Sequence, residues 1–218
     1  MRQVASKWKK YEVLNKHSGV SVHLPATIKF TENGLKEMLS RFSFVVAKPI
    51  VGAGGLGVVK IESNGKGKYH LHHHTTYREN LSWRTLIREI NRIRRGRAYM
   101  IQQGIRLSRV NGRNVDYRVK LVKQGKHWRV TAVVARLSRP KLFVTNLSRG
   151  GTMMKGGLAL RRTFPRYARA KKATMIGVAR TCTHLLEKQF PGLQALGYDF
   201  GIDRKGDVWL FEVNTRPQ

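Results

Sequence analysis

Apolar residues recur at helical spacing in three stretches of the 218-residue chain. The first covers residues 31–42 and begins at Thr31, a residue type that caps helices well. The second covers residues 82–95, with Ser82 as its cap and a glycine directly after it. The third covers residues 175–190. Each stretch is predicted to form an amphipathic helix that buries one face.

Alternating or β-branched residues fill the regions between these helices. The stretches that flank a glycine-containing turn at residues 125–126 are predicted to form an antiparallel hairpin, as are those that flank the turn 204–207. Residues 143–157 are rich in glycine and are predicted to be a loop. Helices mixed with mostly antiparallel strands indicate an α+β fold. The predicted strands cover residues 44–48, 58–62, 68–74, 98–105, 114–124, 127–137, 196–203 and 208–214.

The charge of the chain is strongly positive. It has 43 Lys and Arg against 12 Asp and Glu, a formal net charge of +31. Residues 91–180 hold 24 of these cations and a single acid, Asp116. Such a surface attracts polyanions, so nucleic acid, an acidic peptide or another anionic polymer is an expected partner. The alternative is a generic basic surface that only keeps the protein soluble.

Several classes of protein are excluded by the sequence pattern. No apolar run approaches the roughly 18–20 residues that span a bilayer, and the N-terminus has no apolar segment typical of a secretory signal. The lone Cys182, on an apolar helix stripe, cannot form an intrachain disulfide. His70, His72 and His74 alternate onto one strand face beside His73, but a solvated strand or a contact with a polyanion is favoured over a metal site there. A soluble cytoplasmic protein is therefore expected.

Acidic residues are scarce, and four of the twelve lie in the last twenty positions. Asp199 lies on one strand of the terminal hairpin, and Glu212 and Asn214 lie on the other. Residues two apart on a strand point to the same face. Two carboxylates and an amide oxygen form a hard oxygen site of the kind that Mg²⁺ prefers. The alternative is three unrelated surface residues.

Two further groups of residues are candidates for binding phosphate. Lys48 precedes a glycine-rich loop, whose backbone N–H groups can approach phosphates closely, although the loop joins two strands and could be an ordinary hairpin. Asp116, Arg118 and Lys120 share one strand face, where Asp116 is expected to orient Arg118. A solvated strand face is the alternative for this second group. The loop glycines are Gly52, Gly54, Gly55 and Gly57.

The order of these segments resembles the ATP-grasp superfamily, and most closely its YheC/YheD-type, endospore coat-associated family. The resemblance covers nearly the whole chain, with Asp199 thirteen residues before Glu212. It implies one ATP-grasp domain over residues 1–218, whose two α+β subdomains clamp ATP between them. Residues 25–105 would form the smaller subdomain with the glycine-rich loop, and residues 106–218 the larger one with the Mg²⁺ site. No separate N-terminal domain is expected before this core.

The resemblance also implies a role for individual residues. Lys7 and Lys48 match lysines that contact phosphate, with the glycine-rich loop closing over the phosphates, and Arg118 matches the arginine that stabilises the transferred phosphoryl group. Lys48 and Arg118 would thus be the catalytic residues. The hinge that usually binds adenine corresponds to Gln102, Gln103 and Ile105. The ATP-binding loop of the glutamate-ligase branch corresponds to Asn146 and Arg149. The ligands of two Mg²⁺ ions correspond to Asp199, Glu212 and Asn214.

The activity implied is that of an ATP-dependent carboxylate–amine or carboxylate–thiol ligase that acts through an acyl phosphate. Its expected substrate is anionic, and a peptide or polymer that docks on the basic surface fits this description. Nucleic acid is a further expected partner of that surface. Two alternatives stay open: a non-catalytic protein that binds nucleotide and polyanion in a spore, and an ATP-grasp phosphotransferase. To the expected location in the cytoplasm, the resemblance adds an association with the spore of a spore-forming bacterium.

Overall fold

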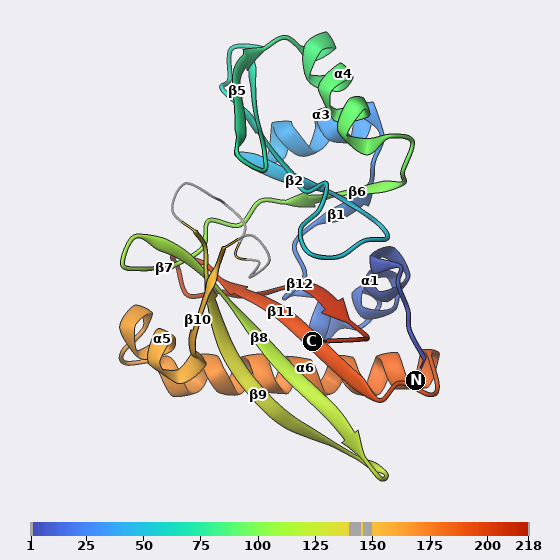
Figure 1. Ribbon diagram of the computed structural model, residues 1–218, viewed down its shortest axis with the longest axis vertical. Helices are drawn as coiled ribbons and strands as arrows, with labels where there is room; N and C mark the ends of the chain where they lie inside the picture. The colour runs from blue at the N-terminus through green and yellow to red at the C-terminus, as the bar shows by residue number, and fades with distance from the viewer. Residues whose placement is uncertain (1, 140–144, 146–149, 218) are drawn as a thin grey trace. The chain divides into compact units, whose positions relative to one another are not determined.

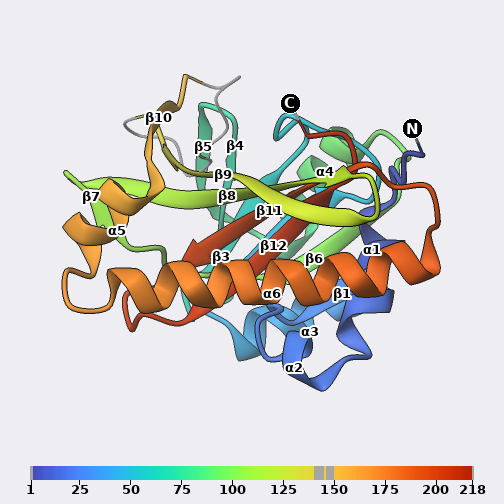
Figure 2. The ribbon, with the colours of Figure 1, turned by 90° about the horizontal axis from the view of Figure 1, so that it is seen from below.

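The protein is represented by a computed structural model that describes residues 2–139, 145 and 150–217. The chain divides into two compact units. Unit 1 combines Met1–Leu24 with Ile105–Gln218, and unit 2 is the inserted segment Pro25–Gly104. Figures 1 and 2 together label the helices and strands of both units.

Unit 2 is built on an antiparallel sheet with the strand order β1-β6-β2-β3-β4-β5. Its helices α3 and α4 both supply apolar side chains to one core with alternate residues of the strands, so they cover the same face of this sheet. Thr31 caps α3 by accepting a hydrogen bond from Gly34 N, and Ser82 caps α4 by accepting one from Thr85 N, as the sequence predicts. The elements of unit 2 are β1 (Thr27–Lys29), α3 (Glu32–Arg41), β2 (Phe44–Pro49), β3 (Val59–Ser63), β4 (Tyr69–His73), β5 (Thr76–Leu81), α4 (Trp83–Arg94) and β6 (Tyr99–Gln103).

Unit 1 has a second antiparallel sheet, with the order β10-β9-β8-β11-β12 and with β7 paired to β8. The long hairpin of β8 and β9 twists along its length (Figure 1). The predicted hairpins and the third predicted helix are confirmed. The elements of unit 1 are α1 (Lys7–Asn15), α2 (Ser18–Ser21), β7 (Arg109–Val110), β8 (Arg113–Gln124), β9 (His127–Leu137), β10 (Thr152–Lys155), α5 (Gly156–Thr163), α6 (Ala168–Gln189), β11 (Ala195–Ile202) and β12 (Val208–Asn214).

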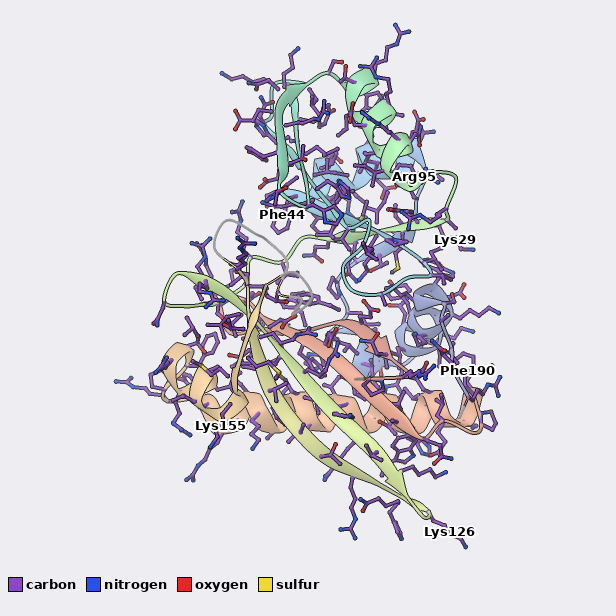
Figure 3. All side chains as sticks on the ribbon, in the orientation of Figure 1. Lys29, Phe44, Arg95, Lys126, Lys155 and Phe190 are labelled. Atoms are coloured by element: carbon purple, nitrogen blue, oxygen red, sulfur yellow. The ribbon has the colours of Figure 1, made fainter. Side chains whose placement is uncertain are left out.

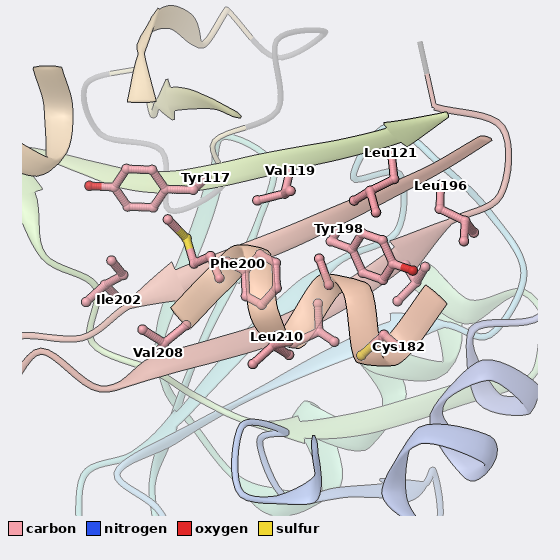
Figure 4. Close-up of a cluster of buried hydrophobic side chains, with 14 of the residues drawn as sticks. Tyr117, Val119, Leu121, Cys182, Leu196, Tyr198, Phe200, Ile202, Val208 and Leu210 are labelled. Atoms are coloured by element: carbon pink, nitrogen blue, oxygen red, sulfur yellow. The ribbon is translucent and has the colours of Figure 1, made fainter. Parts of the chain in front are cut away.

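Helix α6 packs along one face of the unit 1 sheet (Figure 2). Tyr117, Val119 and Leu121 of β8 alternate into this core, and Tyr198 and Phe200 of β11 meet them there (Figure 4). Because neighbouring residues on a strand point to opposite faces, the residues between them lie on the face away from α6. That second face carries the polar side chains described below.

Two sequence predictions are wrong, and one exposed strand was missed. Residues 152–155 lie inside the predicted loop, yet they form the strand β10. This strand pairs with β9 and so becomes the edge strand of the sheet. The strand β5 follows a tight turn and was not predicted, because its mostly exposed side chains do not alternate in polarity. His74 does not continue the strand face of His70 and His72, because it lies after the end of β4 with φ of 54°.

Cys182 is fully buried in the core between α6 and the sheet, as its place on the apolar stripe predicts. Burial raises the pKa of this thiol to about 12, so it behaves as a small apolar side chain.

Among the helices of the described residues, none is both long and apolar enough to cross a membrane.

Candidate functional site

The face of the unit 1 sheet that points away from α6 brings together residues from three strands. Arg118 of β8 lies directly opposite Asp199 of β11, and Asp199 lies opposite Glu212 of β12. Asn214 follows two residues after Glu212 on the same face. Asp199, Glu212 and Asn214 therefore share one face, as predicted, and the structure places Arg118 beside them.

Asp199 is held by two arginines. Arg118 donates from Nε to Oδ1 at 2.7 Å and from Nη2 to Oδ2 at 2.8 Å, a bidentate pair, and Arg136 Nη2 lies 3.2 Å from Oδ1. Burial alone would raise the pKa of Asp199, but Arg136 and Arg118 outweigh burial and lower it. Asp199 is therefore a carboxylate at neutral pH, although its side chain is buried.

Arg136 of β9 is the site residue that the sequence analysis missed. It forms a second bidentate pair, with Nε donating to Asp116 Oδ1 at 2.8 Å and Nη2 donating to Asp116 Oδ2 at 2.6 Å. Thr145 donates a further hydrogen bond to Asp116 at 2.5 Å. Asp116 therefore orients Arg136, and the prediction that it orients Arg118 is wrong.

The cause of this difference is the register of the hairpin. Close to the turn, Leu121 pairs with Val130, but the next pair is Lys120 with Ala132, so Thr131 is skipped. This irregularity shifts β9 by one residue and places Arg136, in place of Ala135, opposite Asp116. The isolated acid in a basic stretch was a usable signal, because a buried carboxylate needs a cationic partner.

Glu212 lies beside two lysines of the N-terminal helix α1. Lys7 Nζ is 3.4 Å from Glu212 Oε1, and Lys10, only 4% exposed, donates from Nζ to Val4 O at 2.6 Å. Burial lowers the pKa of Lys10 to about 8, and the charge of Glu212 opposes this shift. Helix α1 thus adds positive charge to the polar face of the sheet.

Asn214 connects Glu212 and Arg118 when its amide is oriented to satisfy both neighbours. Its Nδ2 then donates to Glu212 Oε1 at 3.1 Å, and its Oδ1 accepts from Arg118 Nη2 at 3.2 Å. The amide oxygen is thereby held on the same side of the strand as the two carboxylates.

The chemistry of these donors fits a divalent cation. Asp199, Glu212 and Asn214 offer the hard oxygen atoms that Mg²⁺ prefers. The site has three carboxylates, those of Asp116, Asp199 and Glu212, which face four cations. Its net charge is therefore slightly positive. A cluster with that balance suits an anion that arrives together with a metal ion. The four cations are Lys7, Lys10, Arg118 and Arg136.

Unit 2 holds the other group of predicted residues. Lys48 of β2 is 7% exposed and donates from Nζ to Gln102 Oε1 at 2.8 Å. Gln102 in turn donates from Nε2 to Thr27 Oγ1 at 3.1 Å, so the chain of hydrogen bonds fixes the lysine in place. The neighbouring Gln103 uses its side-chain oxygen to accept from Ala26 N at 3.2 Å.

The glycine-rich loop between β2 and β3 uses its glycines for backbone reasons. Gly52, Gly54, Gly55 and Gly57 all have positive φ, at 148°, 64°, 71° and 74°. Side chains other than glycine adopt such angles at a cost. The end of the loop is held by Tyr99 of β6, whose hydroxyl donates to Gly57 O at 2.9 Å.

Gly57→Ala is expected to destabilise unit 2 by about 1–3 kcal/mol, because the new Cβ would meet the Tyr99 hydroxyl at a positive φ. The matched control is Gly65→Ala, which has a similar φ of 77° but no atom within 4 Å of its Cβ. Urea unfolding of both variants separates the steric contact from the backbone strain. Equal losses in the two variants would show that the Tyr99 contact does not matter.

The remaining predicted residues are placed only in part. Ile105 is the residue at which the chain returns to unit 1, directly after Gly104. Gly104 was not predicted, yet a Cβ there would collide with the ring of Phe44, so glycine is required at that position. Asn146 and Arg149 lie outside the described residues.

The sequence pattern of the YheC/D-like ATP-grasp family matches residues 2–218. This chain belongs to the YheC/D-like ATP-grasp family. Among curated proteins it is similar to the endospore coat-associated proteins YheD and YheC of Bacillus subtilis, at 28% identity over 97% of the chain and 21% over 99%. The chain corresponds to only 48% of YheD and 61% of YheC.

Solved structures show that this family member has the ATP-grasp fold. Its chain is covered completely by an N5-carboxyaminoimidazole synthase from Aspergillus clavatus, with a TM-score of 0.60, 11% identity and 46% of that chain matched. The VanG D-Ala:D-Ser ligase from Enterococcus faecalis covers 98%, with a TM-score of 0.60, 12% identity and 52% of its own chain matched. The D-cycloserine synthetase DcsG covers 97%, with a TM-score of 0.59, 13% identity and 62% of its own chain matched.

Proposed function

We propose that this ATP-grasp protein is an ATP-dependent ligase that activates a carboxylate as an acyl phosphate and joins it to an amine or a thiol. The observation that carries the proposal is the cluster of Asp199, Glu212 and Asn214 with Arg118 and Arg136 on adjacent strands. Membership of the ATP-grasp family supports ATP binding and ATP-dependent ligase chemistry as a class.

Each residue has a role that its environment favours. Asp199, Glu212 and Asn214 would hold Mg²⁺. The bound ion would neutralise part of the negative charge on the phosphates of ATP. Arg118 uses Nε and Nη2 for Asp199, so Nη1 is left to bind a phosphoryl oxygen. In unit 2, Lys48 and the backbone N–H groups of the glycine-rich loop would bind phosphate oxygens. The phosphate contacts of Lys7 and the adenine contacts of Gln102, Gln103 and Ile105 are part of the same proposal.

The reaction needs no nucleophile from the protein. An oxygen of the substrate carboxylate attacks the γ-phosphorus, and the bond from that phosphorus to the β-phosphate oxygen breaks to release ADP. An amine or thiol then attacks the acyl carbon, and phosphate leaves with the bonding electron pair, while the nucleophile loses its proton. Positioning and charge neutralisation carry most of the catalysis in phosphoryl transfer. A closed loop would keep water from the acyl phosphate.

The biological setting follows from the names of the relatives. Both curated relatives are endospore coat-associated proteins, so we propose that this protein also acts in the cytoplasm of a spore-forming cell or in association with its spore. Its charge of +31 favours an anionic substrate, such as an acidic peptide or polymer.

The test is a product analysis of the full chain with MgATP, a panel of acidic peptides labelled with ¹⁸O in their carboxylates, and a panel of amines and thiols. Transfer of one ¹⁸O into inorganic phosphate, with release of ADP, is expected only when both substrates are present. AMP and pyrophosphate as products would overturn the proposal.

Two other outcomes would assign a different function. A stable phosphate ester, with no ¹⁸O in free phosphate, would identify a phosphotransferase. Binding of a fluorescent ATP analogue with Mg²⁺, without ADP release for any pair in the panels, would favour a non-catalytic nucleotide-binding protein.

A further inference from the structure

The outer side of helix α4 in unit 2 carries a row of arginines. Arg84, Arg88 and Arg92 follow one another at intervals of four residues, and Arg95 stands at the C-cap of the helix. All four are exposed. With about 1.5 Å of rise per residue, they extend along about 16 Å of the helix axis. We call these four residues the α4 arginine face; Figure 3 labels Arg95 at its end.

The position of this face follows from the helix period. At about 100° per residue, Arg84, Arg88 and Arg92 fall within a sector of about 80°. The buried residues Leu86, Ile87 and Ile90 point to the opposite side, toward the sheet. The arginines are therefore held in a row by a helix whose other side is anchored in the core.

Other arginines of the same unit have partners. Arg78 pairs with Glu89 at 3.6 Å, Arg94 stacks on Phe30 with 4.1 Å to the ring centroid, and Arg97 donates to the Tyr99 hydroxyl at 3.3 Å. In contrast, no side chain of the α4 arginine face makes a hydrogen bond, ion pair or ring contact with any residue that the structure describes.

Helix stability does not account for this arrangement. Like charges at a spacing of four residues destabilise a helix. Arg95 also adopts φ of 49°, a left-handed conformation that favours glycine or asparagine. The helix dipole favours Arg92 and Arg95 at the C-terminal end of α4, but it disfavours Arg84 in the first turn. A ligand that neutralises the row would remove the repulsion between its members.

We propose that the α4 arginine face binds the phosphate backbone of a nucleic acid, independently of the ATP site. The guanidinium group binds phosphate oxygens in a bidentate manner, and phosphate contacts alone can supply non-specific binding to nucleic acid. Protein partners, by comparison, usually contribute apolar side chains to the centre of an interface. None of the exposed large apolar residues among those described lies on α4, so a nucleic acid fits this face better than an acidic protein.

The test is the salt dependence of binding to a fluorescein-labelled duplex DNA of mixed sequence, measured by anisotropy over a KCl series. The variant carries Arg84→Gln, Arg88→Gln, Arg92→Gln and Arg95→Asn. Its slope of log K against log salt is expected to be shallower by about 3.6, since each lost phosphate contact contributes about 0.9. Its affinity is expected to fall at least about tenfold, while its Tm is unchanged or higher, because the repulsion and the unfavourable Arg95 backbone are removed.

The matched control removes the same charge from scattered exposed lysines, as Lys16→Gln, Lys66→Gln, Lys126→Gln and Lys188→Gln. The proposal requires a smaller loss of affinity and slope in this control than in the α4 variant. Equal losses of DNA affinity in the two variants would show that only net charge matters. Unchanged DNA binding by the α4 variant would show that the α4 arginine face does not contact the DNA. Either result overturns the proposal.

Two further measurements complete the test. The first is a competition between polyglutamate and the labelled DNA at an equal concentration of negative charge. If polyglutamate displaces the DNA and binds more tightly, the ligand is an acidic polypeptide and the assignment to nucleic acid is overturned. A fluorescent ATP analogue is expected to bind the α4 variant as it binds the unmodified protein. Failure of the ligase proposal would leave the DNA result unaffected, so the two proposals fail separately.

Discussion

Asp199→Asn is expected to reduce ATP-dependent product formation by at least about a hundredfold. The substitution keeps the size of the side chain but removes the charge that Arg118 and Arg136 share. It also removes one of the carboxylates proposed to hold Mg²⁺. Arg118 would lose its bidentate carboxylate partner and is expected to reorient, whereas Arg136 keeps its pair with Asp116. The measurement is ADP release together with binding of a fluorescent ATP analogue in the presence of Mg²⁺.

The control for this variant is Glu187→Gln. Glu187 also has a cationic partner, Lys123, and accepts a hydrogen bond from Trp128 Nε1 at 2.9 Å, but it lies on α6. Its replacement is expected to leave nucleotide binding unchanged. If Asp199→Asn kept more than about a tenth of the binding and ADP release, the proposed metal and phosphate site would be wrong.

Asp116→Ala is expected to destabilise the protein by about 3–5 kcal/mol, the cost of breaking a buried ion pair by removing one partner. Arg136 is 5% exposed, and three hydrogen bonds end on the Asp116 carboxylate. Asp199, at 3.2 Å, still neutralises part of the remaining charge on Arg136, so the lower end of this range is expected. Burial raises the pKa of Asp116, and the charge of Arg136 opposes the rise. Urea unfolding followed by circular dichroism measures the effect.

The control is Glu37→Ala, which removes the carboxylate of an exposed ion pair with Arg41. Exposed pairs of this kind contribute about 0–1 kcal/mol, so a loss of less than about 1 kcal/mol is expected. A similar small loss for Asp116→Ala would show that the network around Arg136 does not stabilise the fold.

Local chemistry made much of the fold predictable from the sequence. Helices α3 and α4 begin at Thr31 and Ser82 because each hydroxyl satisfies a backbone N–H that the first turn leaves open. The turn at residues 125–126 joins β8 to β9, and the alternation of Tyr117, Val119 and Leu121 sets which side of β8 is buried. These features depend on neighbours close in sequence.

Other features depend on contacts that the sequence pattern does not encode. In β12, strict alternation would put Leu210 and Glu212 on the same face, so one of them would be misplaced. Leu210 pairs with Phe200 and Glu212 pairs with Asp199, so Phe211 is an extra residue in a β-bulge. The bulge leaves Leu210 in the core and turns Glu212 to the polar face.

The sequence by itself determined the α+β class, the helix starts and the terminal hairpin that carries Asp199, Glu212 and Asn214, because each follows from local pairing and from residue type. The bulge at Phe211 and the pairing of β8 with β11 then bring Arg118 into one group with these three side chains. Only the tertiary structure decided that Arg136 belongs to this group and that Asp116 orients it. The physical reason is that a shift of one residue in strand register reverses which side chains share a face, and the packing of the whole sheet selects that register.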